Sequence, residues 1–299
     1  MKTPTRLWVA GARPRTLPAA IVPVVVGTAA GYVASVHHLA VLNAILALVV
    51  ALGLQIGTNY VNDYADGQRG TDEVRVGPVR LVAGKLATVR EVKTAALVAF
   101  GVSGIAGFIL ALRVTLWFIP VGLLCALAGW AYTGGRHPYG YLGFGEALVF
   151  IFFGLVATAG SAYVQHRSHG LGFPWSFALW AGVPVGLLAA ALLQANNLRD
   201  IETDRETGKM TVAARLGRSR AGALYVVTLA GAALSLVVLQ HYRGWALIAL
   251  AAAPLAAGPV RLALGDAKGR DLLPMLAMTA RLQLAVGALL TIGLLLVRP

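Results

Sequence analysis

The sequence is poor in the residues that solvate or cross-link a water-soluble domain. Only 12% of its 299 residues are charged, whereas 58% are hydrophobic and the mean hydropathy is +0.74. A single cysteine, Cys125, excludes an intramolecular disulfide and is expected to be a buried structural thiol. No small-residue cleavage site follows a short N-terminal apolar core, so we expect no removable signal peptide. These absences exclude a soluble globular protein and indicate a chain that crosses a membrane several times.

Long apolar stretches account for most of the chain. Each is close to the roughly 20 residues that a helix needs to cross a bilayer. We therefore predict an all-α integral membrane protein with nine transmembrane helices in one domain, residues 1–299, without a soluble domain or flexible linker. The stretches are 17–36, 40–61, 94–112, 115–132, 146–164, 175–195, 221–240, 244–262 and 276–297.

Acidic residues are also scarce: the chain has 12 of them against 25 Lys and Arg. If the N-terminus is cytoplasmic, all but four of these bases fall in inner segments; the four are Arg113, Arg167, Arg243 and Arg298. This asymmetry predicts a cytoplasmic N-terminus and an outer C-terminus in a bacterial-type cell (inner) membrane. It also accounts for the net charge of +13, so we expect no nucleic-acid partner, and nothing implies a protein partner.

Two similar acidic clusters follow apolar stretches. Residues 62–66 read NDYAD and residues 196–200 read NNLRD, so that both fit N-[D/N]-x-x-D-x-x-x-[G/D]. The second cluster ends with Asp204, whereas the first has Gly70 in that column and an acid two residues later, at Asp72. The similarity of the two clusters predicts an internal repeat in which the first four helices match the next four.

The spacing within each cluster points to a cation. Residues three and four apart share one face of a helix, where like charges repel. Mg²⁺ binds oxygen ligands and bridges one or two carboxylates to substrate phosphates. We predict that the two clusters face each other across Mg²⁺ and a diphosphate; the alternative is solvated loop charges paired with arginines. The predicted catalytic carboxylates are Asp63, Asp66, Asp200 and Asp204. The predicted metal ligands are these four with Asn62, Asp72, Asn196 and Asn197.

Basic residues near the clusters would complete a diphosphate site. A departing diphosphate needs its developing charge neutralised by metal and cationic donors. The positive-inside bias is the alternative explanation for each base, and placement in an interfacial aromatic belt is the alternative for the tyrosine. The predicted ligands are Arg69, Arg80, Lys85, Tyr132, Arg199 and Lys209.

This pattern resembles the intramembrane aromatic prenyltransferases of the UbiA superfamily. Their N-D-x-x-D-x-x-x-D motif after helix 2 begins like residues 62–66, and their D-x-x-x-D motif after helix 6 matches Asp200 and Asp204. Their Y-x-x-x-K element appears as Tyr132-x-x-x-Arg136, which adds Arg136 to the expected diphosphate ligands. Because arginine keeps the charge of lysine but not its geometry, this position departs from the family pattern. The resemblance covers essentially the whole chain.

The Gly70 variant resembles one branch of the superfamily, which prenylates 1,4-dihydroxy-2-naphthoate in menaquinone synthesis. The segments RPRTLPA at 13–19, GPVR at 77–80, YGYLG at 139–143 and NNLRD at 196–200 are also similar to that branch. The resemblance implies Mg²⁺-dependent transfer of a polyprenyl chain from its diphosphate to dihydroxynaphthoate. Diphosphate and CO₂ would be lost, and demethylmenaquinone would form in the lipid bilayer.

Binding of the acceptor carboxylate by Arg13, Arg15 or His137 is a further expectation of that resemblance. Snorkelling or topology bias is the alternative for the arginines, and a role in a turn is the alternative for His137.

Three other functions fit parts of the pattern. The same fold could prenylate another aromatic acceptor, such as 4-hydroxybenzoate or homogentisate. Asp63-x-x-Asp66-Gly67 begins like the motif of CDP-alcohol phosphotransferases, but the Ala-Arg pair of that motif is absent. Membrane carboxylates also mark cation transporters, although those usually bind ions near the bilayer midplane on broken helices.

Overall fold

The computed structural model describes residues 4–35, 38–69, 80–166, 172–242 and 245–296. Over these ranges the chain forms helices and turns and no β-strand, which confirms the predicted all-α class. Short 3₁₀ helices cover Pro14–Thr16 (η1), Tyr139–Leu142 (η2), Ala246–Ala256 (η4) and Gly269–Leu272 (η5), and Phe150–Val156 (η3) is π-helical. The α-helices are α1 (Thr5–Gly11), α2 (Pro18–Ala34), α3 (Val41–Arg69), α4 (Val89–Arg113), α5 (Phe118–Ala131), α6 (Gly145–Val149), α7 (Ala157–Tyr163), α8 (Trp175–Arg199), α9 (Ile201–Glu206), α10 (Val212–Leu216), α11 (Arg218–Leu239), α12 (Ala257–Leu264) and α13 (Leu273–Leu295).

Seven helical segments of the described chain are long and apolar enough to cross a membrane. The segment Thr5–Thr16 forms an eighth candidate together with α2, from which it is bent by 57°. The nine predicted stretches all fall on helical segments, but α5 has only 14 residues, fewer than the roughly 20 that span a bilayer. The prediction of a multi-helix membrane bundle is confirmed, whereas a ninth crossing stays a prediction.

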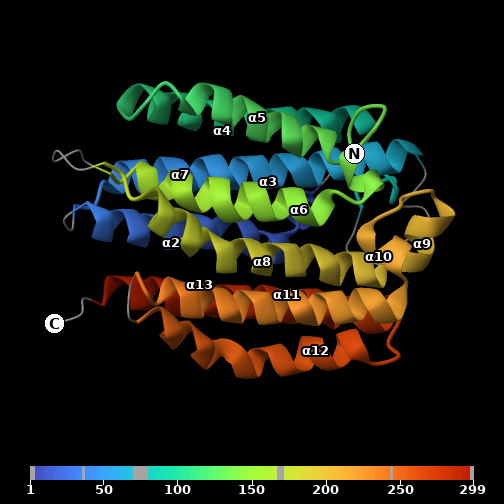
Figure 1. The fold of residues 1–299 in the computed structure, drawn as a ribbon. Coiled ribbons are helices and arrows are strands. Elements are labelled where there is room, and N and C mark those ends of the chain that lie inside the picture. Colours follow the sequence, from blue (N-terminus) through green and yellow to red (C-terminus); the bar gives the residue numbers. More distant parts are fainter. Residues whose placement is uncertain (1–3, 36–37, 70–79, 167–171, 243–244, 297–299) are drawn as a thin grey trace.

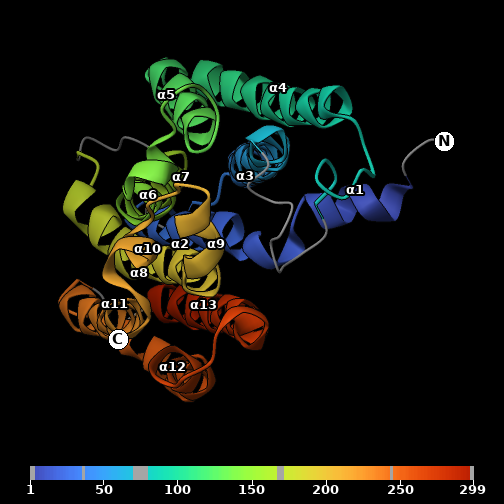
Figure 2. The same ribbon diagram turned by 90° about the vertical axis from the view of Figure 1, so that its right-hand side faces the viewer.

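The helices run side by side along one axis (Figure 1). Viewed along that axis, α4 and α5 lie on one side of the bundle and α11, α12 and α13 on the other (Figure 2). Between them lie α2, α3, α6, α7 and α8, and α2 packs against α7, α13, α8 and α3. The central position of α2 explains its composition: twelve of its seventeen residues are buried, and none is charged.

Glycines allow α2 and α7 to approach closely. A Cβ atom at Gly27 would lie 2.3 Å from the carbonyl oxygen of Thr158, and one at Gly31 would lie 2.3 Å from that of Ala162. Small residues spaced four apart commonly bring the backbones of membrane helices together. The pair therefore holds the π-helical segment η3, which continues into α7, against the centre of the bundle.

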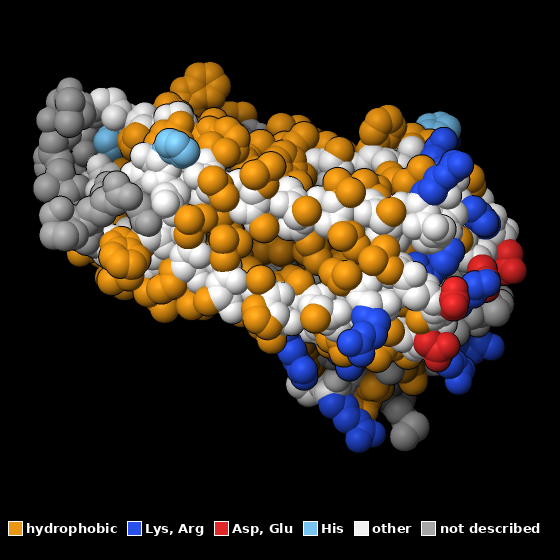
Figure 3. Space-filling view, turned by 60° about the horizontal axis from the view of Figure 1, so that its bottom comes forward, with side chains coloured by type: hydrophobic (Ala, Val, Ile, Leu, Met, Phe, Trp, Pro, Cys, Tyr) orange, Lys and Arg blue, Asp and Glu red, His pale blue; other side chains and the backbone are white. Residues whose placement is uncertain are grey.

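Charged side chains gather at the end of the bundle that carries α9 and α10, and an apolar band covers the middle of the face in Figure 3. The chain begins near this charged end and finishes at the opposite end (Figure 1). This arrangement fits an odd number of crossings. The cytoplasmic location of the charged end stays a prediction, as does the internal repeat.

The contact between α2 and α7 can be tested with a pair of Gly→Ala variants. Gly27→Ala inserts a methyl group against backbone and should lower the unfolding free energy by about 1–3 kcal/mol, seen as a reduced Tm of the purified protein. Gly104→Ala on α4 meets no atom within 4 Å and should leave Tm unchanged or slightly raised. Equal Tm values for Gly27→Ala and the parent protein would show that the helices do not pack in this way.

Candidate active site

One cavity of about 500 Å³ runs through the bundle between α2, α3, α5, η3 and α8. Its two ends differ sharply in chemistry. The polar end is lined by Asn62, Asp66, Arg80, Tyr132, Asn196, Arg199 and Lys209. The remaining length is mostly apolar, with Ala47, Leu110, Phe118, Val121, Phe152 and Val164 among its lining residues. Ala47 and Asp66 both lie on α3, nineteen residues apart, so the lining extends over roughly 30 Å of helix.

The first acidic cluster lies at the polar end, on the last turns of α3. Asp66 is 2% exposed; it accepts a hydrogen bond from the Tyr141 hydroxyl at 2.9 Å and lies 3.9 Å from the Arg80 guanidinium. Asn62 accepts a hydrogen bond from the Thr133 hydroxyl. Both side chains line the cavity, as the spacing in the sequence predicts.

Asp63 has a different environment from its neighbours in the cluster. It is fully buried, and its two carboxylate oxygens accept hydrogen bonds from the backbone N–H groups of Leu81 and Val82, at 2.9 and 3.0 Å. The carboxylate does not line the cavity. It anchors the segment 80–86 against α3 and so helps to place Arg80 beside Asp66.

Arg69 and Tyr141 connect the end of α3 with the α5–α6 and α9–α10 connections at the polar end. Arg69 donates hydrogen bonds to the carbonyl oxygens of Thr133 and Gly135, and its guanidinium lies 5.2 Å from the centre of the Tyr141 ring. The Lys209 ammonium lies 5.5 Å from the same ring. Cations are attracted to the faces of aromatic rings. Tyr141 therefore sits between bases from the two halves of the chain.

The second acidic cluster lies where α8 ends and α9 begins. The Arg199 guanidinium donates to both oxygens of Asp200 at 2.7 Å and to the Asn196 oxygen at 2.8 Å. Asp204 lies 3.8 Å from the Lys209 ammonium. Asn196, Arg199 and Lys209 line the cavity, whereas the Asn197 amide points to Glu146 on α6, at 2.9 Å.

Tyr139 adds a hydroxyl to the cavity wall near Tyr132, with ring centres 5.5 Å apart. Burial raises the pKa of the Tyr139 phenol above its usual range. A phenol is protonated at neutral pH even without this shift, so the hydroxyl can donate a hydrogen bond.

The described residues contain no group of three or more His, Cys, Asp and Glu side chains close enough to enclose a metal ion. The polar end of the cavity offers a carboxylate from Asp66 and amide oxygens from Asn62 and Asn196. Such a donor set fits Mg²⁺, which rarely occupies an all-protein cage and completes its coordination with substrate phosphates and water.

Several predicted ligands lie outside the cavity lining. Lys85, Arg136 and His137 are exposed. Five further predicted ligands are also absent from the lining: Asp63, Arg69, Asn197, Asp200 and Asp204. The ligand roles of all these residues stay predictions. Arg13 and Arg15 do line the cavity. Asp72 and Gly70 lie outside the described residues, so the ligand role of Asp72 also stays a prediction.

A family model described as the UbiA prenyltransferase family matches residues 20–278. The chain belongs to the UbiA prenyltransferase family. It is 50% identical over 289 residues, 96% of this chain and 95% of the relative, to a protein of Mycobacterium tuberculosis named 1,4-dihydroxy-2-naphthoate octaprenyltransferase. A protein of Escherichia coli with the same name is 34% identical, over 98% of this chain and 96% of the relative.

Solved structures of UbiA homologues share the fold. The apo structure of a homologue from Aeropyrum pernix K1 superposes with a TM-score of 0.65 at 19% identity, covering 91% of this chain and 97% of that one. A homologue from Archaeoglobus fulgidus bound to GPP and Mg²⁺ gives 0.59 at 15% identity, covering 95% and 99%. The TM-scores show that this chain has the UbiA architecture.

Several residues of the cavity and its surroundings were not predicted from the sequence. Thr16, Gln55, Asn59, Thr133 and Tyr139 line the cavity, Tyr141 contacts Asp66, and Glu146 contacts Asn197. One signal was available: Gln55, Asn59, Asn62 and Asp66 are spaced four, three and four apart, a polar stripe on one face of a helix. The other residues are isolated in the sequence, and only the fold brings them together.

The anchoring contact of Asp63 leads to a hydrogen-exchange prediction. In Asp63→Ala, the amides of Leu81 and Val82 lose a charged acceptor and should exchange about 10- to 100-fold faster than in the parent protein. Asp66→Ala, which removes the neighbouring carboxylate of α3, should leave those two amides protected. Hydrogen-deuterium exchange read by mass spectrometry on peptides covering residues 80–86 measures this. Equal exchange in the parent and Asp63→Ala proteins would rule out the anchor.

Proposed function

We propose that this protein transfers a polyprenyl chain from polyprenyl diphosphate to 1,4-dihydroxy-2-naphthoate, releasing diphosphate and CO₂ and forming the reduced, quinol form of demethylmenaquinone. The observation that carries the proposal is a single cavity with oxygen donors and cations at one end and an apolar remainder. A diphosphate joined to a long hydrocarbon has the same division of polarity. The names of relatives 50% and 34% identical over nearly the full chain support the same acceptor.

The diphosphate binds at the polar end. The Arg80, Arg199 and Lys209 side chains and the Tyr132 hydroxyl surround that end of the cavity and neutralise its charge. Arg69 supports them through Tyr141. Asp66, Asn62 and Asn196 at the cavity wall would hold Mg²⁺, together with Asp200 and Asp204 of the second cluster, which are not among the lining residues. The bound ion would withdraw charge from the leaving diphosphate.

The transfer needs no redox partner. The allylic C–O bond breaks, and its electrons leave with the diphosphate. The ring carbon that bears the carboxylate forms the new C–C bond with its π electrons, and loss of CO₂ returns an electron pair that restores aromaticity. Water would trap the allylic cation, and apolar side chains such as Phe118, Val121 and Phe152 exclude it from the rest of the cavity.

Arg13 and Arg15 are the bases that we assign to the acceptor carboxylate. Both line the cavity from the bend between α1 and α2. Arg13 adopts a left-handed backbone conformation with φ of 55°. A non-glycine residue in this conformation is uncommon and often marks a functional site. We place this polar end on the cytoplasmic side of a multi-pass cell membrane, because the bases concentrate in the segments that join the helices at this end.

The acceptor is tested directly with purified protein, Mg²⁺ and a polyprenyl diphosphate. We expect dihydroxynaphthoate to be prenylated with release of equimolar CO₂, and 4-hydroxybenzoate and homogentisate to be used poorly. Chelation of divalent metal should stop turnover, and added Mg²⁺ should restore it. Preferred prenylation of 4-hydroxybenzoate would overturn the acceptor assignment, and metal-dependent ion transport without release of diphosphate would overturn the enzyme assignment.

The carboxylates are tested by substitution. Asp66→Ala and Asp200→Ala should each lower kcat at least about 100-fold, because each removes charge that positions metal and diphosphate. Glu202→Ala is a matched control, since Glu202 is exposed, lies next to the second cluster and does not line the cavity. Its kcat should stay within about twofold of the parent value. Near-normal turnover in the Asp66 or Asp200 variant, with normal membrane insertion, would refute the site.

A further inference from the structure

A polar side chain lies deep in the cavity, beyond the residues assigned to the diphosphate. Gln55 is only 7% exposed and shares the inner face of α3 with Asn59 and Asn62. Seven residues separate it from Asn62, which corresponds to about 10 Å of helix rise. Apolar residues such as Ala19, Leu54 and Phe152 line the same part of the cavity. None of the roles proposed above uses this buried carboxamide.

Hydrogen bonds determine which way the carboxamide faces. Its nitrogen donates to the Thr16 hydroxyl oxygen at 3.1 Å and lies 3.5 Å from the Asn59 oxygen. The Asn59 amide donates to the same Thr16 oxygen at 3.0 Å and to the Ala12 carbonyl at 2.9 Å. Because the Thr16 hydroxyl donates its own hydrogen to the Arg13 carbonyl, at 2.9 Å, its oxygen can only accept from Gln55.

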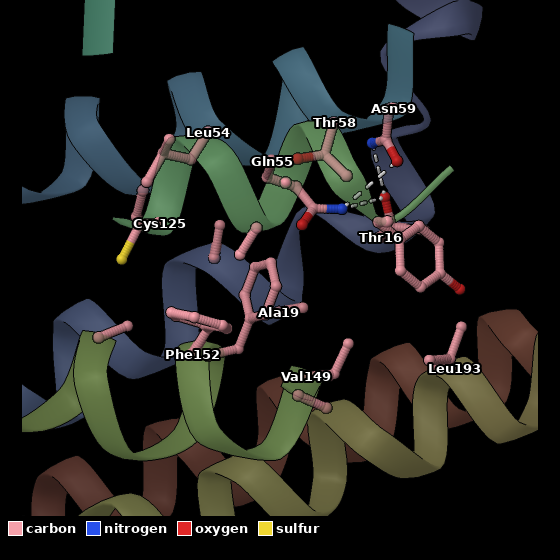
Figure 4. Close-up of a pocket in the computed structure, with 18 of the residues that line it drawn as sticks. Thr16, Ala19, Leu54, Gln55, Thr58, Asn59, Cys125, Val149, Phe152 and Leu193 are labelled. Atoms are coloured by element: carbon pink, nitrogen blue, oxygen red, sulfur yellow. Dashed lines mark hydrogen bonds between the residues drawn. The ribbon is translucent and has the colours of Figure 1, made fainter. Parts of the chain in front are cut away.

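The Gln55 oxygen is therefore turned toward the cavity. Figure 4 shows the nitrogen facing Thr16 and Asn59 and the oxygen pointing the other way, toward the space beside Ala19 and Phe152. No residue in the described ranges donates a hydrogen bond to this oxygen. The oxygen is an open acceptor at the cavity wall, so a ligand hydroxyl placed there would gain a hydrogen bond.

We propose that Gln55 binds the 4-hydroxyl of the naphthoate acceptor and orients its ring. The proposal rests on the function proposed above. In 1,4-dihydroxy-2-naphthoate the 1-hydroxyl lies ortho to the carboxylate and donates to it internally. The 4-hydroxyl has no internal acceptor; it lies para to the 1-hydroxyl and meta to the carboxylate. With the carboxylate at Arg13 and Arg15, the 4-hydroxyl points into the cavity and meets the Gln55 oxygen.

This contact would select acceptors by a hydroxyl group. A site with a buried acceptor oxygen rejects a ligand that lacks the matching hydroxyl, because the oxygen then stays unpaired. The same network ties Gln55 to the backbone of Ala12 and Arg13, so the residues that bind the carboxylate and the 4-hydroxyl of the acceptor are held in one rigid unit. The distance between the carboxylate and hydroxyl sites is fixed by that unit.

Equilibrium binding to protein in nanodiscs tests the proposal. Dissociation constants are measured, without oxygen, for 1,4-dihydroxy-2-naphthoate and for 1-hydroxy-2-naphthoate, which lacks only the 4-hydroxyl. The parent protein should bind the dihydroxy compound about tenfold more tightly. In Gln55→Met, of similar length, the two constants should become equal through loss of affinity for the dihydroxy compound alone. Gln55→Glu keeps an acceptor oxygen and should retain the preference.

A second glutamine supplies the matched control. Gln165 is 1% exposed, accepts a hydrogen bond from the Ala40 amide at 2.8 Å and does not line the cavity. Gln165→Met should keep the parent preference, even if it lowers stability. If Gln55→Met lowered the affinity for both ligands equally, the role of Gln55 would be structural and the proposal would be overturned. The proposal would also be overturned if the parent protein prenylated dihydroxynaphthoate but bound both ligands equally tightly. Failure of the parent protein to prenylate dihydroxynaphthoate would instead overturn the proposed function.

Discussion

The structure depends on the compensation of carboxylates that are buried at one end of an apolar bundle. Asp63, Asp66, Asp200 and Asp204 are each at most 5% exposed, and an uncompensated charge at that depth would cost several kcal/mol. Each has a partner from a connecting segment or a helix end: backbone amides for Asp63, Arg80 and Tyr141 for Asp66, Arg199 for Asp200 and Lys209 for Asp204. These contacts draw three connections together over one end of the cavity.

This concentration of charge divides the cavity into regions with separate tasks. The polar end suits a diphosphate with its metal ion, whereas the apolar length suits a hydrocarbon chain and keeps water away. We propose that the acceptor binds between these regions, beside a polar wall that Arg13, Thr16, Gln55 and Asn59 form at the start of η1 and on α3. The bend of 57° between the N-terminal segment and α2 brings that wall to the cavity.

Much of this arrangement could be predicted from the sequence, because local periodicity determined it. Spacings of three and four residues placed Asn62 and Asp66 on one face, and the apolar stretches identified the helical segments. Partners far apart in the chain left no such signal: nothing in the sequence ties Asp63 to the amides of Leu81 and Val82. Adjacent residues of one motif also have different roles: Asn196 lines the cavity, whereas the Asn197 amide donates a hydrogen bond to Glu146. The positive charges of Lys85 and Arg136 suggested diphosphate ligands. Each residue, however, lies in an exposed connection between helices and does not line the cavity.

The central claim is that the two acidic clusters hold a metal–diphosphate between them at the polar end of the cavity. The most direct measurement is anomalous diffraction from crystals grown with Mn²⁺ and an unreactive thio-analogue of a prenyl diphosphate. We expect a metal peak within coordination distance of Asp66 and of the Asp200–Asp204 segment, with phosphate density beside Arg80, Arg199 and Lys209 and the prenyl chain extending toward Phe118. A metal peak away from both clusters, or a chain that runs in the opposite direction, would contradict the central claim.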